Sequence, residues 1–120
     1  MVVRVVRFRV AAAFAHAATE AARTEIFGAR RPPGLVRATF GRQESGAGWV
    51  TFVTVSEWTD MASIYAWMGG PELQVVALPE GWTAPTETLD VQHYVVALSD
   101  SVGGEPTDHA GSDPVVPPAT

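Results

Sequence analysis

Hydrophobic and polar residues alternate along the first segment of the chain, VVRVVRFRV, residues 2–10. Val6, Phe8 and Val10 fall on one side of an extended chain here, and Arg7 and Arg9 fall on the other. A period of two and a high content of valine are typical of a half-buried strand. We therefore expect a first β-strand in this segment.

Three later segments have the same extended character. Residues 35–43 alternate apolar and polar side chains, residues 49–57 are rich in valine and threonine, and the glycines of residues 44–48 between them predict a hairpin. A last strand is predicted over residues 91–98, VQHYVVAL. The pattern thus predicts strands at both ends of the domain and a hairpin in its middle.

Two segments have a helical pattern instead. The first helix is predicted in the alanine-rich segment that starts at Ala11, because alanine is the best helix former. Gly28 is expected to end it, because glycine favours helix ends. Residues 60–68 place their larger apolar side chains at i, i+3, i+4 and i+7, and either Thr59 or Asp60 provides the N-cap. A short helical turn is expected from Pro71 to Leu78. The side chains predicted to form the buried stripe of the second helix are Met61, Ile64, Tyr65 and Met68.

The order of these elements is β-α-β-β-α-β. It predicts a ferredoxin-like α+β fold, an antiparallel sheet with both helices on one face. The other face of the sheet then has no cover, although 47% of the residues are hydrophobic. Because a second copy of the chain could cover that face sheet on sheet, we expect a homodimer.

Composition divides the chain into a domain and a tail. Residues 1–99 carry all the predicted elements, whereas residues 100–120 are rich in Gly, Pro, Asp, Ser and Thr and contain acidic residues but no arginine. Such a composition does not bury a core. We predict a single domain at 1–99 and an acidic C-terminal tail at 100–120.

The composition also excludes several classes of function. The chain has no cysteine and no lysine, which excludes disulfides, thiolate chemistry and a lysine Schiff base. Metal ligands do not cluster, so no metal site is predicted. A net charge of -5 argues against a nucleic-acid surface. No apolar run has the length of a membrane span, and arginines interrupt the N-terminus in a way that signal peptides do not allow. We expect a cytoplasmic protein without nucleic-acid or membrane partners.

The stretch from Trp49 to Gly70, WVTFVTVSEWTDMASIYAWMGG, holds three of the four tryptophans. Trp67 lies off the centre of the buried stripe of the second helix, at the edge of the expected interface between helix and sheet. It can therefore either pack in the core or form the wall of a pocket. The same two interpretations apply to Trp58 and to Tyr65.

This stretch, with GLVRATFGRQ before it and DVQHYVVAL after it, resembles the antibiotic biosynthesis monooxygenase family. The resemblance covers residues 49–78, and more loosely 2–98. It implies a dimeric α/β barrel in which two ferredoxin-like subunits pair. The family includes cofactor-independent enzymes that form quinones and enzymes that degrade haem, so the resemblance leaves the reaction open.

The haem-degrading branch is one alternative. Its helical tryptophan matches Trp67, whereas its iron-ligating histidine falls at Val76 or Ala77. Its asparagine on the first strand falls at Arg7, and the chain contains no asparagine. Haem binding would then depend on His93 or on the tryptophans.

The cofactor-independent branch is the preferred interpretation. The resemblance implies a catalytic role for Trp67, with Ser63 in place of the family asparagine one turn earlier. His93 can accept a phenolic proton, because the ordinary pKa of histidine lies near neutrality. The candidates for binding the substrate and its oxyanion are Arg7, Arg9, Arg42, Trp58 and Tyr65.

We therefore predict a small homodimeric, cofactor-independent monooxygenase, or a related tailoring enzyme, that acts on a hydrophobic, polyketide-like aromatic substrate. Two alternatives stay open. One is a haem-binding or haem-degrading protein, and the other is a non-catalytic dimer that binds a small hydrophobic ligand.

Overall fold

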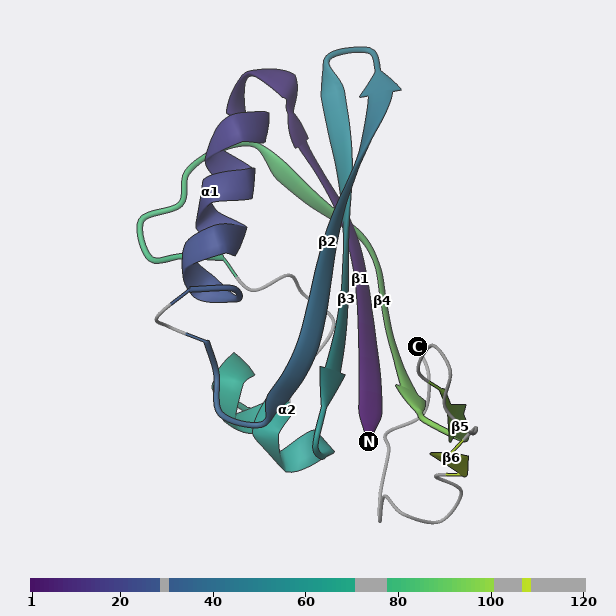
Figure 1. Ribbon diagram of the computed structural model, residues 1–120. Coiled ribbons are helices and arrows are strands. Elements are labelled where there is room, and N and C mark those ends of the chain that lie inside the picture. Colours follow the sequence, from purple (N-terminus) through teal and green to yellow (C-terminus); the bar gives the residue numbers. More distant parts are fainter. Residues whose placement is uncertain (29–30, 71–77, 101–106, 109–120) are drawn as a thin grey trace.

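The computed structural model describes residues 1–28, 31–70, 78–100 and 107–108 (Figure 1). In chain order the elements are β1 (Val2–Ala11), the 3-10 helix η1 (Ala12–Phe14), α1 (Ala15–Glu25), β2 (Leu35–Gly46), β3 (Trp49–Trp58), α2 (Met61–Met68), β4 (Thr86–Val95), β5 (Leu98–Ser99) and β6 (Thr107–Asp108). The helical turn predicted from Pro71 lies, apart from Leu78, outside the described residues.

The main sheet is antiparallel and has the strand order β2-β3-β1-β4. In Figure 1 α1 and α2 lie on the same side of this sheet. The arrangement confirms the predicted ferredoxin-like α+β fold. Because β1 runs between β3 and β4, a side chain that β1 directs towards the helices has a strand on either side of it.

The helix-covered face of the sheet carries the core. On β1 the residues that face the helices are Val2, Arg4, Val6, Phe8 and Val10, and all of them are buried. The predicted apolar side of this strand is therefore correct. It also includes an arginine.

Three phenylalanines stack across the strands of this face. The ring centroids of Phe8 and Phe52 are 5.6 Å apart, and those of Phe40 and Phe52 are 4.9 Å apart. Offset aromatic pairs at such distances contribute about 0.5–1.5 kcal/mol beyond the area they bury. The stack forms the centre of the core under α1.

α1 packs closely on the sheet because alanines form its buried side. Ala15, Ala18 and Ala22 are buried there. The helix begins at Ala15 rather than at the predicted Ala11, since β1 continues to Ala11 and a 3-10 turn follows. The short side chains leave space between helix and sheet that larger residues would fill.

α2 has the ends that the sequence predicts. Asp60 is the N-cap, and its carboxylate accepts a hydrogen bond of 2.8 Å from the backbone N–H of Ser63. Gly69 ends the helix with a φ of 80°, which side-chain-bearing residues rarely adopt. The cap and the glycine together place Trp67 in the last turn. Within the predicted stripe, Met61 and Ile64 are buried and Tyr65 and Met68 are partly buried.

β4 differs from its prediction, because it runs from Thr86 to Val95 instead of over residues 91–98. Its register on β1 shifts between Arg7 and Phe8. A bulge there breaks the alternation of apolar residues on which the prediction relied. The part beyond the bulge alternates as expected, and Val91 and His93 are buried.

The other face of the sheet carries a row of valines and neither helix covers it (Figure 1). Val5 is paired with Val55, and Val3 and Val53 lie on the same face beside them. These side chains are partly buried or exposed in the single chain. We call this surface the open face.

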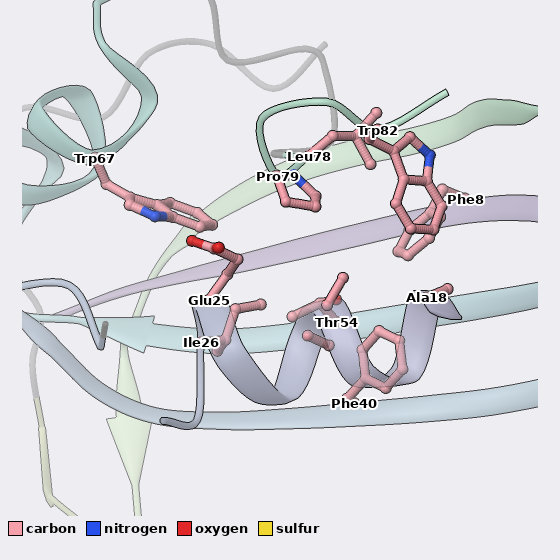
Figure 2. A pocket seen from close by; sticks show the side chains of 12 residues that line it. Phe8, Ala18, Glu25, Ile26, Phe40, Thr54, Trp67, Leu78, Pro79 and Trp82 are labelled. Carbon is pink, nitrogen blue, oxygen red and sulfur yellow. The ribbon is translucent and has the colours of Figure 1, made fainter. Parts of the chain in front are cut away.

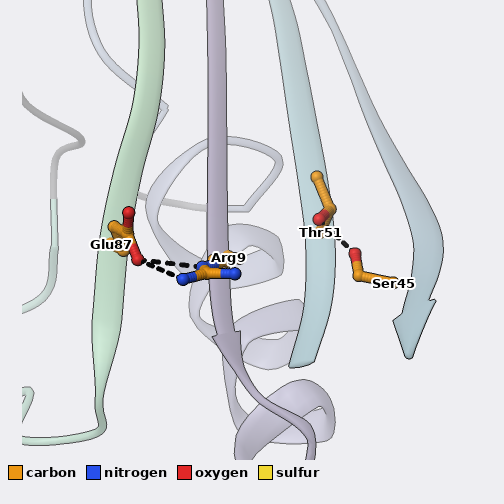
Figure 3. Close-up of polar contacts among 4 residues, drawn as sticks. All are labelled: Arg9, Ser45, Thr51 and Glu87. Atoms are coloured by element: carbon orange, nitrogen blue, oxygen red, sulfur yellow. Dashed lines mark hydrogen bonds and ion pairs between the residues drawn. The ribbon is translucent and has the colours of Figure 1, made fainter. Parts of the chain in front are cut away.

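Polar contacts cross the open face near the hairpin, and Figure 3 looks onto them with the helices behind the sheet. Arg9 binds the carboxylate of Glu87 through two nitrogens, at 2.6 and 2.9 Å. The Arg9 guanidinium also lies 4.4 Å from the ring centre of Trp49. Ser45 and Thr51 form a hydrogen bond between β2 and β3.

β5 and β6 form a small two-stranded sheet after β4. They join residues on the two sides of the boundary predicted at residue 99, and the division into a domain at 1–99 and a tail at 100–120 stays a prediction. Neither helix of the described chain combines the length and the apolar character that crossing a membrane requires.

Candidate functional site

A cavity lies between the helices and the covered face of the sheet (Figure 2). In Figure 2 the ring of Trp67 stands at one end and Trp82 and Phe8 stand at the other. Leu78 and Pro79, from the chain before β4, lie opposite the alanines of α1. The described residues that line this large lobe are Phe8, Ala18, Ala21, Ala22, Glu25, Ile26, Phe40, Thr54, Trp67, Leu78, Pro79 and Trp82.

A smaller lobe adjoins the large one. Ile26, Thr54 and Trp67 line both lobes. The residues that line only the smaller one are Arg4, Val6, Pro32, Leu35, Ser56 and Trp58. We call it the Arg4 lobe, and the two lobes together the inner cavity.

The inner cavity is narrow. The centres of water molecules have about 40 Å³ in the large lobe and about 30 Å³ in the Arg4 lobe. That space holds a few waters, whereas ligand pockets usually measure about 300–1,000 Å³. A ligand with an aromatic ring system therefore has to displace part of the wall.

Trp67 forms the border between the inner cavity and the surface. Its ring packs on that of Trp58 with the centroids 5.1 Å apart, and Trp58 Nε1 donates a hydrogen bond of 2.9 Å to Ser56 Oγ. Trp67 also lines an open cleft of about 660 Å³ between α2 and the loop that carries Pro32 and Pro33. Movement of this one side chain would connect the outer cleft with the inner cavity.

Arg4 gives the smaller lobe its charge. Only 1% of its surface is exposed, and its Nη1 donates a hydrogen bond of 2.8 Å to His93 Nε2. A guanidinium has no acceptor atom, so His93 Nε2 is the acceptor. Arg4 Nη2 lies 3.7 Å from Met68 Sδ. Burial lowers the pKa of Arg4 to about 10, and the group is still cationic at neutral pH.

His93 lies behind Arg4 and is a weak base. Burial, and to a lesser extent the charge of Arg4, lower the pKa of His93 to about 4. The ring is neutral at physiological pH, but its Nε2 lone pair already accepts from Arg4. A group with so low a pKa is inefficient at removing a phenolic proton. The proposed catalytic role of His93 stays a prediction, and the contact that the structure shows is one that orients Arg4.

Ser63 borders the outer cleft and is not among the described residues that line the inner cavity. Its hydroxyl donates a hydrogen bond of 2.9 Å to Asp60 Oδ1. The hydrogen bonds from the Ser63 backbone and side chain lower the pKa of Asp60. A side chain on Gly34, whose φ is 87°, would clash with Ser63, so this serine packs against the loop before β2. Its catalytic role stays a prediction.

The other predicted binding residues are spread over the fold. Arg7 lies on the open face, on the side of β1 opposite to the inner cavity. Arg42 lies near the hairpin, where its Nε is 2.7 Å from a carboxylate oxygen of Glu44. Tyr65 packs against the core cluster under α2. Among the residues predicted for substrate binding or catalysis, only Trp58 and Trp67 line the described inner cavity.

Four polar residues that line the inner cavity were missing from the sequence prediction, namely Arg4, Glu25, Thr54 and Ser56. The sequence does indicate that Arg4 faces the core, because alternate residues of a strand point to the same side and Arg4 lies two residues before Val6 and four before Phe8. Thr54 is 8% exposed and lines both lobes. No buried side-chain nitrogen or oxygen in the described part of the chain lacks a hydrogen-bond partner.

Residues 1–77 match the antibiotic biosynthesis monooxygenase family. The chain belongs to this family. The matching segment carries both helices and the strands that form the floor of the inner cavity, so membership and geometry concern the same part of the protein. Together they support a monooxygenase-like or small-molecule-binding role. No curated protein and no solved structure matches the chain.

The haem-degrading monooxygenases of the family raise the question of a haem site. His93 is buried and its Nε2 accepts a hydrogen bond from Arg4, and the inner cavity holds only a few waters. Val76 and Ala77 lie outside the described residues. Residues 1–28, 31–70, 78–100 and 107–108 contain no group of His, Asp and Glu that could hold a metal ion. Haem ligation by His93 Nε2 would require Arg4 to give up this hydrogen bond.

Proposed function

We propose that this protein is a cofactor-independent monooxygenase that acts as a homodimer on a small hydrophobic aromatic substrate. The observation that carries the proposal is the inner cavity, which has aromatic and aliphatic walls and ends at Trp67. Flat ring systems suit such walls, because aromatic side chains offer large apolar faces for stacking.

The reaction that we propose needs little from the protein. An anthrone-type substrate loses a proton from its CH₂ carbon, and the anion transfers an electron to dioxygen before carbon and oxygen combine. Loss of water then leaves a carbonyl group. One oxygen atom stays on the carbon, the other leaves as water with the two hydrogens, and the substrate supplies all electrons. The protein has to bind and orient the anion and shield it from water.

We place the entrance for the substrate at Trp67. This side chain borders the inner cavity and also the outer cleft, and Leu78 and Pro79 line the cavity close to it. Rotation of the Trp67 ring away from Trp58 would admit a ring system from the cleft. After binding, the ring would stack on the substrate.

Turnover of an anthrone under air tests the proposal, with quinone absorbance as the readout. We expect Trp67→Phe to lower kcat/KM by about tenfold or more, because the indole forms the pocket wall. Trp49→Phe is the matched control, since Trp49 packs with Arg9 on the open face. It should leave kcat/KM unchanged.

The absence of any rate above buffer, or equal rates for the two tryptophan variants, would contradict the proposal. Thermal stabilisation by the anthrone without turnover would assign the cavity to a non-catalytic ligand-binding protein. Melting temperatures of both variants show whether each is folded.

The open face supports the homodimer. Its valines form an apolar surface on a sheet that no described helix covers on that side. A stable protein interface buries about 1,200–2,000 Å² in total, which a face of this sheet can supply when it meets a second copy. The dimer would leave the inner cavity, on the opposite face, intact.

A further inference from the structure

We infer that Met68 is an oxidation site, at which a hydroperoxide converts the thioether to one epimer of methionine sulfoxide. The site lies in the last turn of α2, next to Trp67, where that turn contacts Arg4. The inference does not rest on the proposed function, because any source of peroxide can supply the oxygen atom and no anthrone is involved.

Methionines are the only sulfur-containing residues of the chain. The sequence has three of them and no cysteine, so a peroxide finds thioethers and no thiol. Two of the three lie in α2, Met61 in its first turn and Met68 in its last. The helix therefore holds two thioethers whose surroundings can be compared directly.

The two thioethers differ in access. Met61 is 6% exposed and belongs to the core cluster under α2, whereas Met68 is partly exposed and packs against that cluster. The backbone after Met68 borders open space, because a Cβ atom added to Gly69 or Gly70 would meet no described atom within 4 Å. Since oxidation of sulfur side chains follows their exposure, Met68 should react before Met61.

Arg4 shields one side of the Met68 sulfur. Its Nη2 donates to Met68 Sδ over 3.7 Å, and this hydrogen bond is weak because a thioether is a poor acceptor. The bond nevertheless occupies one of the two lone pairs of the sulfur. An oxygen atom then adds at the other lone pair, and addition at a single lone pair gives a single sulfoxide epimer.

The reaction balances with hydrogen peroxide as the oxidant. The free lone pair of the sulfur attacks one peroxide oxygen, the O–O bond breaks and an S–O bond forms. The second oxygen leaves as water after proton transfer, so the sulfur loses two electrons and the peroxide gains them. The product is polar and chiral, whereas the thioether was apolar.

The added oxygen changes the packing beside Trp67. Met68 and Trp67 are neighbours in the chain, and both pack against the cluster that contains Trp58 and Ile64. A polar sulfoxide packs there less favourably than a thioether. We expect the melting temperature of the oxidised protein to fall by about 2–5 °C, and reduction of the sulfoxide to restore it.

Timed exposure of the full chain to dilute hydrogen peroxide tests the order of reaction. Chymotrypsin cuts after Tyr65 and so places Met61 and Met68 on different peptides, which are quantified by mass spectrometry. We expect Met68 to gain oxygen at least about fivefold faster than Met61 in the folded protein, and at the same rate in urea. Equal rates in the folded protein, or a slower reaction at Met68, would overturn the inference.

The configuration of the sulfoxide tests the contact with Arg4. Each of the two methionine sulfoxide reductases accepts one epimer, and both are applied with a dithiol to the isolated Met68 peptide. In peptide from the folded protein, one enzyme should repair at least about five times more sulfoxide than the other. Sulfoxide formed in urea should divide about equally between the two enzymes. Equal shares from the folded protein would contradict shielding by Arg4.

Two variants connect the modification with stability. Met68→Leu keeps an apolar side chain without the sulfur, and peroxide should leave its melting temperature unchanged. Met61→Leu is the matched control, and peroxide should lower its melting temperature as in the wild type. A loss in Met68→Leu as large as in the wild type would assign the effect to another residue and reject Met68 as the site.

Discussion

The two faces of the main sheet accommodate charge in opposite ways, and two arginines of one strand show the difference. Arg9 points to the open face, where its side chain is 35% exposed and pairs with Glu87. Arg4 points under the helices, is 1% exposed and donates to the neutral ring of His93. An exposed ion pair costs little and contributes little, whereas burying a cation carries a large desolvation penalty. The buried arginine is therefore the costlier of the two to hold in the fold, and its hydrogen bond to His93 offsets part of that cost.

The apolar residues differ between the faces in the same way. On the covered face the phenylalanine stack is buried and borders a cavity, whereas on the open face the valines are only partly covered in the single chain. The first face carries the core and the candidate site. The second is the surface that we assign to the dimer.

The largest expected difference concerns core packing. Phe52 is 0% exposed at the centre of the stack, and Phe52→Ala should lower the free energy of unfolding by about 3–5 kcal/mol. Val55→Ala on the open face should cost about 1 kcal/mol or less when the chain is monomeric. Denaturant unfolding at low protein concentration measures both. Equal losses would contradict the assignment of the two faces.

Acid should destabilise the covered face through His93. Its pKa is about 4 in the folded chain and about 6.5 in the unfolded chain, so the unfolded state gains a proton first as pH falls. Stability should therefore fall between pH 6.5 and pH 4, by up to about 3 kcal/mol from this group. Unfolding across this range is compared with His93→Gln, which does not titrate. The same pH dependence in both proteins would show that His93 does not keep its low pKa.

A charge on the open face should weaken the dimer. Val55→Glu would bury a carboxylate against the partner's sheet, and we expect the dimer to dissociate at least about tenfold more readily. Sedimentation at several concentrations measures the dissociation constant, and Glu87→Gln at the edge of the face is a milder comparison. A wild-type chain that sediments as a monomer at all concentrations would end the dimer proposal.

The smallest effect is expected for the exposed ion pair. Glu87→Gln should cost only about 0.2–1 kcal/mol, and added salt should reduce the difference from the wild type. A salt-independent loss of several kcal/mol would mean that Arg9 and Glu87 are buried in the assembled protein.

The fold could be predicted from the sequence because its signals are local. The alternation on β1, the Asp60 cap and the glycine stop at Gly69 each depend on a few neighbouring residues. The start of β4 could not be predicted, because a bulge against β1 sets it and the partner strand lies far away in the chain.

The candidate site could be predicted only in part. Trp67 was identified because it lies off the buried stripe of its helix. Arg4 was overlooked, although the alternation along β1 places it on the same side as Val6 and Phe8. Its contact with His93 joins residues that are 89 positions apart in the sequence. That pairing depends on the register between β1 and β4, which no local pattern reveals. Ser63 was placed by resemblance, and the direction of its side chain depends on the Asp60 cap and Gly34.

Labelled dioxygen gives the most direct test of the central claim, that the inner cavity supports oxygenation without a cofactor. Metal-free protein is incubated with an anthrone under isotopically labelled dioxygen, and the quinone is analysed by mass spectrometry. We predict one labelled oxygen atom per quinone, formed without added metal, haem or reductant and at least about tenfold more slowly by Trp67→Phe. An unlabelled product, or turnover that requires an added cofactor, would contradict the claim.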